Sequence, residues 1–287
     1  KYHPSVQVID AQVMPEHFYG LLHLDAAPNE TLGKVIRGFK LGCNKIYGVL
    51  YHQEKVALFT RGYNETPITG EEVQTKILYI RANPERCLIK GQLSDSFTVF
   101  RNQHSTNWTT DRILQGLRHD YRLAQDKETL QQALADIQPK LLTDKQGQLA
   151  LDYIGKRTLL SAPRKLPLVC HRADAQRFAE QSAAVMREAA RGAVIVSAFV
   201  SKQEREILKQ LLDDYYPVIE IRDNGFGKTY KPAGVSFYAC AQERLLQITP
   251  WKYHYEKDPQ PISRPMCMVM NELARLISGQ PDDWWKR

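Results

Sequence analysis

The chain has 287 residues, enough for one large domain or two domains of ordinary size. Hydrophobic residues make up 43% and charged residues 25%, a balance that is typical of a globular protein with a buried core. This composition excludes a disordered tail, a collagen and a disulfide miniprotein. The 39 basic residues exceed the 32 acidic ones, so the net charge is +7, which favours a polyanionic partner such as nucleic acid but also occurs on ordinary surfaces.

The five cysteines are widely spaced and form no C-x-x-C pair, which argues against a zinc knuckle or a disulfide framework. The longest apolar run, 193–200, is too short to cross a membrane. We therefore expect reduced cysteines, a cytoplasmic location and no membrane partner. The chain begins at Lys1 rather than at Met, so a signal or a first strand is expected to lie upstream.

The first hundred residues predict a mixed α/β domain, because β-branched alternating runs are interspersed with helical patterns. Thr31 and Thr69 are good N-caps, and the second helix should stop before Pro84. The expected elements are strands at 6–13, 17–24 and 55–59, a helix from Thr31 to about Tyr47, and a helix at 70–82.

The rest of the chain begins with a polar stretch and then changes to β-α-β alternation, which predicts a mainly parallel sheet. We expect three parts: a domain at 1–95, an insert at 96–160 and a Rossmann-like domain at 161–287. The expected elements are helices at 127–137, at 175–191 and after Ser201, strands at 168–171, 193–199 and 217–221, and a hairpin at 148–160 that turns near Gly155.

A candidate catalytic group lies on the second predicted strand and the second predicted helix. His17 and Tyr19 project from one face of the strand, and Tyr79 and Asn83 share one face of the helix. A tyrosine hydroxyl beside a divalent cation can attack a phosphodiester. Spacing alone favours a histidine and a tyrosine that simply pack on the sheet.

Four segments resemble, in this order, the single-tyrosine HUH transposases of the REP-associated branch and their Bacteroides-type relatives. They are SVQVIDAQVMPEHFYGLLHL at 5–24, LGKVIRGF at 32–39, LFTRGYN at 58–64 and YIRANPER at 79–86. The resemblance implies a ferredoxin-like fold, with its first strand before residue 1, and a protein that cuts single-stranded DNA beside hairpins.

The same resemblance implies that Tyr79 is the nucleophile and forms a 5′-phosphotyrosine, while His17 and Asn83 hold Mg²⁺ or Mn²⁺. The sequence departs from the family at the second histidine, where Tyr19 stands, and a neutral phenol is a poor ligand for these cations. A domesticated, non-catalytic nucleic-acid-binding protein, without a cofactor, therefore stays open as the alternative. The protein is expected to act as a monomer or a homodimer.

Basic residues gather on the same four segments, with tyrosines between them, as a single strand or a hairpin would require. A solvated charged face explains any one of them nearly as well. The candidate DNA-binding residues are Lys34, Arg37, Lys40, Arg61, Arg81, Arg86 and Lys90.

In the Rossmann-like part, polar residues follow strands at the sheet edge where such folds bind ligands. The candidate ligand site is Ser197, Ser201, Arg205, Asp223 and Asn224. Neither G-x-G-x-x-G nor a Walker loop is present, and a capping box also explains Ser201 with Glu204. This half loosely resembles the Rossmann-like domain of DNA processing protein A. A small-molecule enzyme that uses this domain is the third alternative.

Overall fold

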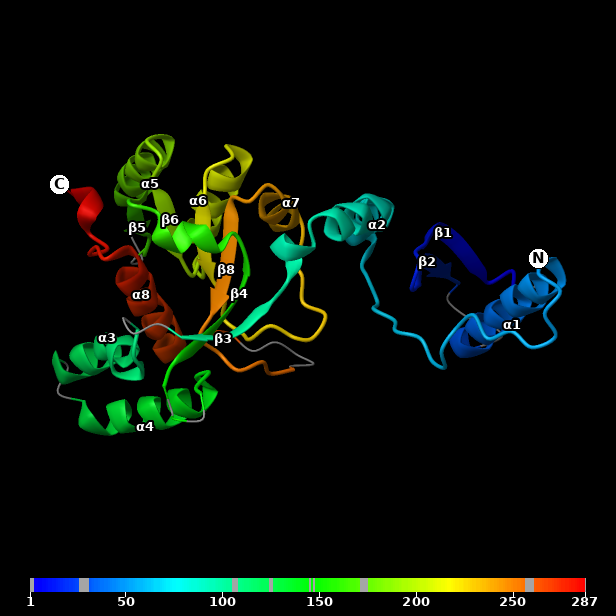
Figure 1. Ribbon diagram of the computed structural model, residues 1–287, viewed down its shortest axis with the longest axis horizontal. Coiled ribbons are helices and arrows are strands. Elements are labelled where there is room, and N and C mark those ends of the chain that lie inside the picture. The colour runs from blue at the N-terminus through cyan, green and yellow to red at the C-terminus, as the bar shows by residue number, and fades with distance from the viewer. Residues whose placement is uncertain are drawn as a thin grey trace. The chain divides into compact units, whose positions relative to one another are not determined.

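The computed structural model describes residues 3–25, 31–104, 108–123, 126–144, 146, 148–170, 175–255 and 261–286. The chain folds into two compact units, Lys1–Ile89 and Lys90–Arg287 (Figure 1). The predicted insert at 96–160 lies within the second unit, to which it contributes two strands and two helices.

The first unit contains a two-stranded antiparallel sheet and two long helices. Strands β1 (Val6–Val13) and β2 (Phe18–Leu24) pair from Val6 with Leu24 to Val13 with Phe18. Helix α1 spans Leu32–Leu50 and α2 spans Val73–Gln92, after the short 3-10 turn η1 (Gly70–Glu72). The strands predicted at 6–13 and 17–24, and the predicted starts of both helices, are thus confirmed within two or three residues.

Two expectations for this unit are wrong. Residues 55–59 form no strand; this segment is held as a loop, and the Leu58 N–H donates to Asn44 Oδ1 at 3.1 Å. Helix α2 does not stop before Pro84 but continues through it. The burial of Ile80 and Asn83 on α2 accounts for this, since tertiary packing outweighs the local cost of a proline.

The second unit is built on a six-stranded sheet in the order β3-β4-β8-β7-β6-β5. Strands β5 to β8 run parallel, and β3 and β4 are antiparallel additions at one side. The strands are β3 (Phe100–His104), β4 (Ala150–Gly155), β5 (Lys165–Pro167), β6 (Val194–Ser197), β7 (Val218–Ile221) and β8 (Leu245–Thr249). The mixed α/β class and the mainly parallel sheet predicted from the sequence are confirmed.

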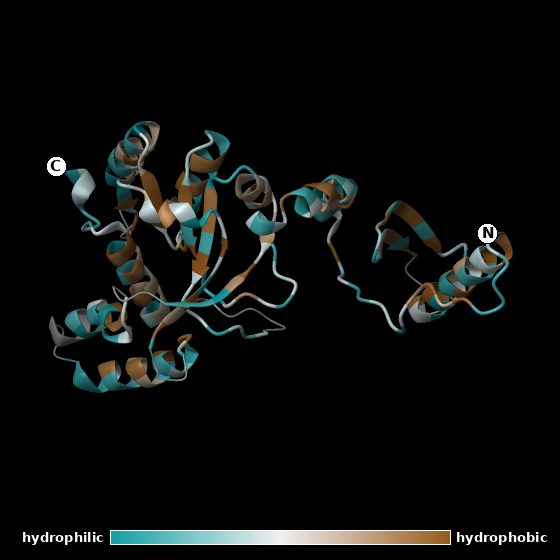
Figure 2. Ribbon diagram, in the orientation of Figure 1, coloured by the Kyte–Doolittle hydropathy of each residue, from teal (hydrophilic) through white to brown (hydrophobic). Residues whose placement is uncertain are grey.

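Helices cover both faces of this sheet (Figure 1). Helices α5 (Ala175–Ala190), α6 (Lys202–Asp213) and α7 (Val235–Ala241) connect successive parallel strands, so right-handed crossovers place all three on one face. The other face is covered by α3 (Thr110–Leu123), α4 (Lys127–Ile137) and α8 (Arg264–Ser278). Figure 2 shows α4 with an apolar and a polar side, as a helix packed on a core requires.

The predicted hairpin at 148–160 and the predicted strand at 168–171 are corrected by the structure. Strand β4 ends at Gly155, whose φ is 104° and where a Cβ would lie 2.2 Å from the Leu245 carbonyl oxygen. Only glycine permits this close approach, after which the chain enters the 3-10 turn η4 (Arg157–Ser161) instead of returning. The strand expected at 168–171 is β5, three residues earlier, and His171 lies outside the described residues.

Candidate nucleic-acid interface

The first unit brings three aromatic rings of the predicted catalytic group together. The His17 and Tyr19 rings meet edge to face with centroids 4.7 Å apart, and the Tyr19 and Tyr79 rings do so at 6.0 Å. Helix α2 therefore packs its tyrosine across β2, as the pattern of residues suggested.

Helix α2 adds an amide and a guanidinium near these rings. Asn83, one turn after Tyr79, is only 3% exposed, and its Nδ2 has no hydrogen-bond partner among the described residues. The Arg86 guanidinium lies 5.5 Å from the centre of the Tyr79 ring. A buried amide without a partner costs about 1–3 kcal/mol, so an acceptor that reached Asn83 would remove this cost.

The residues at this cluster do not fit a divalent cation. Burial, with the hydrogen bond to Tyr79, raises the pKa of Tyr19 to about 12, so the phenol is neutral at physiological pH. Among the described residues, no group of three histidine, cysteine, aspartate or glutamate side chains could hold a metal ion. His17 and Asn83 would provide two ligands, where Mg²⁺ or Mn²⁺ needs a fuller set of oxygen donors. The group that lies against Tyr79 is moreover the neutral phenol of Tyr19, which is a poor general base.

The predicted DNA-binding cations of this unit differ in what they contact. Lys40 donates through Nζ to the carbonyl oxygens of Thr60 and Gly62 and so holds the loop that carries Arg61. Arg81 pairs with Asp10 at 2.9 Å but remains 69% exposed, so the pair is weak and a phosphate can compete for it. Lys34, Arg37 and Arg61 also lie exposed, as does Lys90, which is the first residue of the second unit.

In the second unit, the predicted anion site after β6 is already filled by the protein itself. Ser201 Oγ accepts the Glu204 N–H at 3.1 Å, and Glu204 accepts the N–H groups of Ser201 at 3.0 Å and Cys170 at 2.8 Å. The buried Glu204 carboxylate would repel an anion here. Ser197 is fully buried and accepts the Phe199 N–H at 3.1 Å, so the capping box explains this segment and leaves Arg205 as an exposed side chain.

The other part of the predicted site has a structural role at the ends of β7 and β8. Asn224 donates to the His254 carbonyl oxygen at 2.7 Å and accepts the N–H groups of Gly225 and His254. A Cβ on Gly225 would lie 2.2 Å from the Tyr253 nitrogen, and one on Gly227 would lie 3.2 Å from the Tyr253 ring. The two strand-end loops are therefore joined by Asn224, next to the half-buried Asp223, and packed together at two glycines.

A buried polar network lies behind these loops, and the sequence analysis missed it. Arg222 donates to Glu220 at 2.6 Å, Gln247 donates to Glu220 at 2.6 Å, and the Tyr230 hydroxyl donates to Gln247 at 2.8 Å. Burial raises the pKa of Tyr230 to about 12. Glu220 on β7 lies opposite Gln247 on β8 in the register of the two strands. A polar residue within each of two apolar strands was the sequence feature that could have predicted this network.

Arg101 on β3 braces the glycine loop from the antiparallel side of the sheet. It donates to Asp152 at 2.7 Å, to the Phe226 carbonyl oxygen at 2.6 Å and to the Gly227 carbonyl oxygen at 3.0 Å, and its side chain stays 39% exposed. Exposed Lys228 follows Gly227 in the chain, and the Tyr253 ring, on a residue that is 54% exposed, lies on Gly227. Lys252 precedes Tyr253, but its ammonium donates to the Pro139 carbonyl oxygen at 2.9 Å. We call Arg101, Gly227, Lys228 and Tyr253 the glycine-loop surface.

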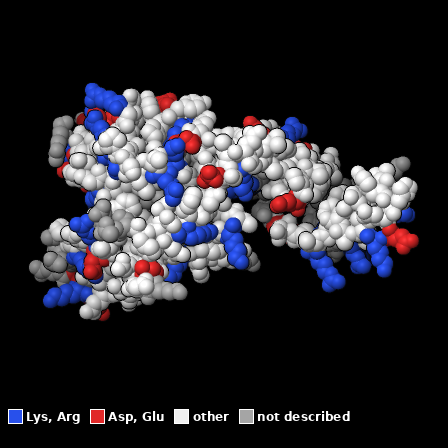
Figure 3. Space-filling view, in the orientation of Figure 1, with Lys and Arg blue, Asp and Glu red and all other residues white. Residues whose placement is uncertain are grey.

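On the face of the molecule that Figure 3 shows, charge alone does not locate an interface. Figure 3 shows Lys and Arg side chains spread over several elements rather than gathered in one continuous patch. The glycine-loop surface differs because it combines cations with an exposed ring at the carboxyl edge of a parallel sheet, where such sheets bind ligands.

None of the described helices is long and apolar enough to span a bilayer.

No protein-family model and no curated protein matches this sequence. Two solved structures are similar to it at a low level. One is DNA processing protein A from Helicobacter pylori, described for its single-stranded DNA binding mode, with 20% identity over 48% of this chain and a TM-score of 0.33. The chain spans about 60% of that protein. The other is DNA processing protein A from Streptococcus pneumoniae, with 14% identity over 86% of this chain and 76% of that chain, also at a TM-score of 0.33.

Proposed function

We propose that this protein binds single-stranded nucleic acid through the glycine-loop surface and does not cleave it. The observation that carries the proposal is that Arg101 and the Tyr253 ring both contact Gly227, with exposed Lys228 next to it in the chain. Cations along a groove and an exposed ring for stacking are what a single strand needs. The net charge of +7 agrees with such a partner, and single-stranded DNA is what the H. pylori protein is described as binding.

The aromatic cluster of the first unit supports binding more than chemistry. Tyr79 faces another tyrosine rather than a base, and the side chains around it do not provide the ligands of a divalent cation. Arg86, Lys34 and Arg37 are suited to phosphate contacts. The non-catalytic alternative among the sequence interpretations is therefore the one that we adopt.

The test is fluorescence anisotropy of a labelled oligothymidylate at low salt. We expect Tyr253→Ala to weaken binding by about tenfold, because one stacked base contributes about 1–3 kcal/mol, while Tyr253→Phe keeps the ring and the affinity. Lys228→Ala should weaken binding less and lower the salt dependence by about one released counterion. Lys209→Ala, an exposed lysine two turns into α6, is the matched control.

Two results would contradict the proposal. Equal affinities for wild type and Tyr253→Ala would place the contact elsewhere. An absence of binding at low salt would exclude a nucleic-acid partner and would favour a small-molecule ligand for the second unit.

A cleaving transposase is the second candidate, and one observation favours it. Tyr79 and the unpartnered amide of Asn83 lie one turn apart on α2, as the resemblance to HUH transposases requires. A covalent adduct between the protein and DNA that disappears in Tyr79→Phe would establish this activity.

A further inference from the structure

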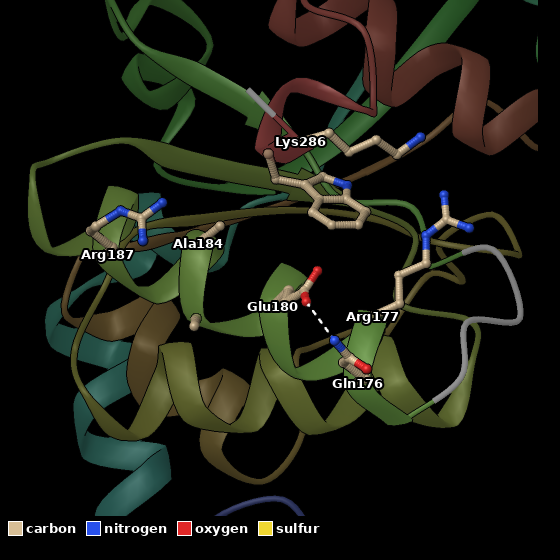
Figure 4. Close-up of a pocket in the computed structure, with 8 residues that line it drawn as sticks. Gln176, Arg177, Glu180, Ala184, Arg187 and Lys286 are labelled. Carbon is tan, nitrogen blue, oxygen red and sulfur yellow. Dashed lines mark hydrogen bonds between the residues drawn. The ribbon is translucent and has the colours of Figure 1, made fainter.

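A cavity in the second unit is lined by none of the residues of the glycine-loop surface. It has a volume of about 840 Å³ and opens to solvent between α5 and the 3-10 turn η5 (Trp284–Lys286) (Figure 4). A smaller cavity of about 180 Å³ shares Arg177, Trp285 and Lys286 and extends to Val169, just after β5. The larger one is lined by Gln176, Arg177, Glu180, Ala183, Ala184, Arg187, Trp285 and Lys286.

The two adjacent tryptophans of η5 have different roles. Trp284 donates its ring N–H to the Pro167 carbonyl oxygen at 2.8 Å, which fixes η5 to the end of β5. Arg275 on α8 pairs with Asp282 at 3.0 Å and fixes the segment that leads to it. These two contacts place the half-buried Trp285 over α5. Its ring is therefore held in position before any ligand binds.

The floor of the cavity is one face of α5 that carries small residues in its middle. Ala183 and Ala184 leave open space where larger side chains would fill it. In Figure 4 Arg187 and Arg177 stand at opposite ends of the pocket, with Ala184 and Glu180 between them on the helix. Glu180 is held by Gln176, whose side-chain amide donates to it at 3.3 Å.

Cations border the Trp285 ring without stacking closely on it. The Arg177 guanidinium and the Lys286 ammonium each lie 5.8 Å from the ring centre, whereas Arg157 lies 4.1 Å from the ring of Phe100. A flat group can therefore approach the indole. Arg177, Arg187 and Lys286 line the pocket beside the carboxylate of Glu180. Asp283, 4.0 Å from Lys286, and Glu188, 3.9 Å from Arg187, offset part of their charge, but Glu188 is shared with Arg164 and Arg191, so the Arg187 end of the pocket stays positive.

We propose that this pocket binds one nucleotide, with its base stacked on Trp285 above Ala184 and its phosphate at Arg187. An aromatic ring with an anionic group attached is the ligand that matches an indole beside guanidinium groups. The Glu180 carboxylate disfavours additional negative charge, so a monophosphate or a phosphodiester fits better than a triphosphate. The same chemistry is offered by a free nucleotide and by a nucleotide within a single strand.

The inference is tested by calorimetric titration with AMP, adenosine, inorganic phosphate and a short single-stranded oligonucleotide. We expect AMP or the oligonucleotide to bind, and Trp285→Ala to weaken that binding by at least about tenfold, while Trp285→Phe keeps most of it. Arg187→Ala should weaken it several-fold. Arg191→Ala, one turn further along and outside the pocket, is the control with the same change of charge.

The probes separate the two sources of the ligand. Binding of AMP that depends on Trp285 indicates a free nucleotide, and binding of the oligonucleotide alone indicates a base of a strand, in which case the inference rests on the proposed function. Full affinity in Trp285→Ala for both probes, or no binding of either, would overturn the inference. Failure of the proposed function is distinct, because it leaves Tyr253→Ala without effect.

Discussion

The two units of this protein cover their apolar surface to different degrees. In 1–89 the buried hydrophobic side chains among the described residues are Met14, Leu21 and Ile80, and α1 buries none of its side chains. In the second unit a sheet with helices on both faces encloses a continuous core. Two strands cannot cover long amphipathic helices, whereas six strands between two helical layers can.

The difference shows where the stability of the chain lies. The apolar side chains that α1 leaves exposed include Phe39, Leu41, Ile46, Val49 and Leu50, at 41–69% exposure. Exposed apolar surface contributes little to folding, because burial is what stabilises. We therefore expect the second unit to determine the main unfolding transition.

The largest expected effect comes from a matched pair of isoleucines. Ile248→Ala on β8 removes a side chain with no exposure and should lower the free energy of unfolding by about 2–5 kcal/mol. Ile46→Ala on α1, where the residue is 63% exposed, should change it by no more than about 0.5 kcal/mol. Urea unfolding followed by circular dichroism measures both, and equal effects would refute the difference between the units.

A second pair consists of Tyr230 and Tyr19, one in each unit. The pKa of each tyrosine is raised from its ordinary value of 10 to about 12, and burial is the largest cause. A raised pKa in the folded state gives stability that is full below pH 10 and is lost as the pH rises toward 12. For Tyr230 this loss should reach about 2 kcal/mol, and it should be smaller for the more exposed Tyr19.

Alkaline titration of tyrosine absorbance, compared with Tyr230→Phe and Tyr19→Phe, separates these two contributions. A main unfolding transition that stayed equally sensitive to alkaline pH in Tyr230→Phe would contradict the assignment to Tyr230.

The smallest effect is expected from the two capping boxes. Ser201→Ala at the start of α6 should cost about 1 kcal/mol, because Ser201 and Glu204 satisfy each other's N–H groups. Thr69→Ala removes a hydroxyl that donates to Glu72 at 3.1 Å but leaves the Thr69 N–H bonded to the same carboxylate. Its cost should therefore be smaller, and a larger loss of helix content in Thr69→Ala than in Ser201→Ala would reverse this ranking.

Much of the secondary structure was accessible from the sequence because it depends on local patterns. Strand β1, helix α4 and the capping box of α6 match their predictions, since alternation, an N-cap and a helical period determine each of them. The continuation of α2 through Pro84 depends instead on tertiary burial. The end of β4 at Gly155 depends on a neighbouring strand, which no local pattern reveals.

The candidate site was less accessible for the same reason. The approach of Tyr79 to Tyr19 could be predicted, because the sequence pattern places each tyrosine on a defined face of its helix or strand. The resemblance to a known family pointed to the same residues. The role of Arg101 could not be predicted, because 125 positions separate it from the Phe226 carbonyl oxygen that it contacts. Trp285 lies over α5 only because Trp284 is bound to Pro167, a contact between distant parts of the sequence.

The most direct test of the account is one experiment with a labelled single-stranded hairpin DNA, Mn²⁺ and low salt, read on native and denaturing gels. Wild type and Tyr79→Phe should both retain the DNA on the native gel, and neither should give a covalent band on the denaturing gel. A covalent band in the wild type that is absent in Tyr79→Phe, or no retention by either protein, would contradict binding without cleavage.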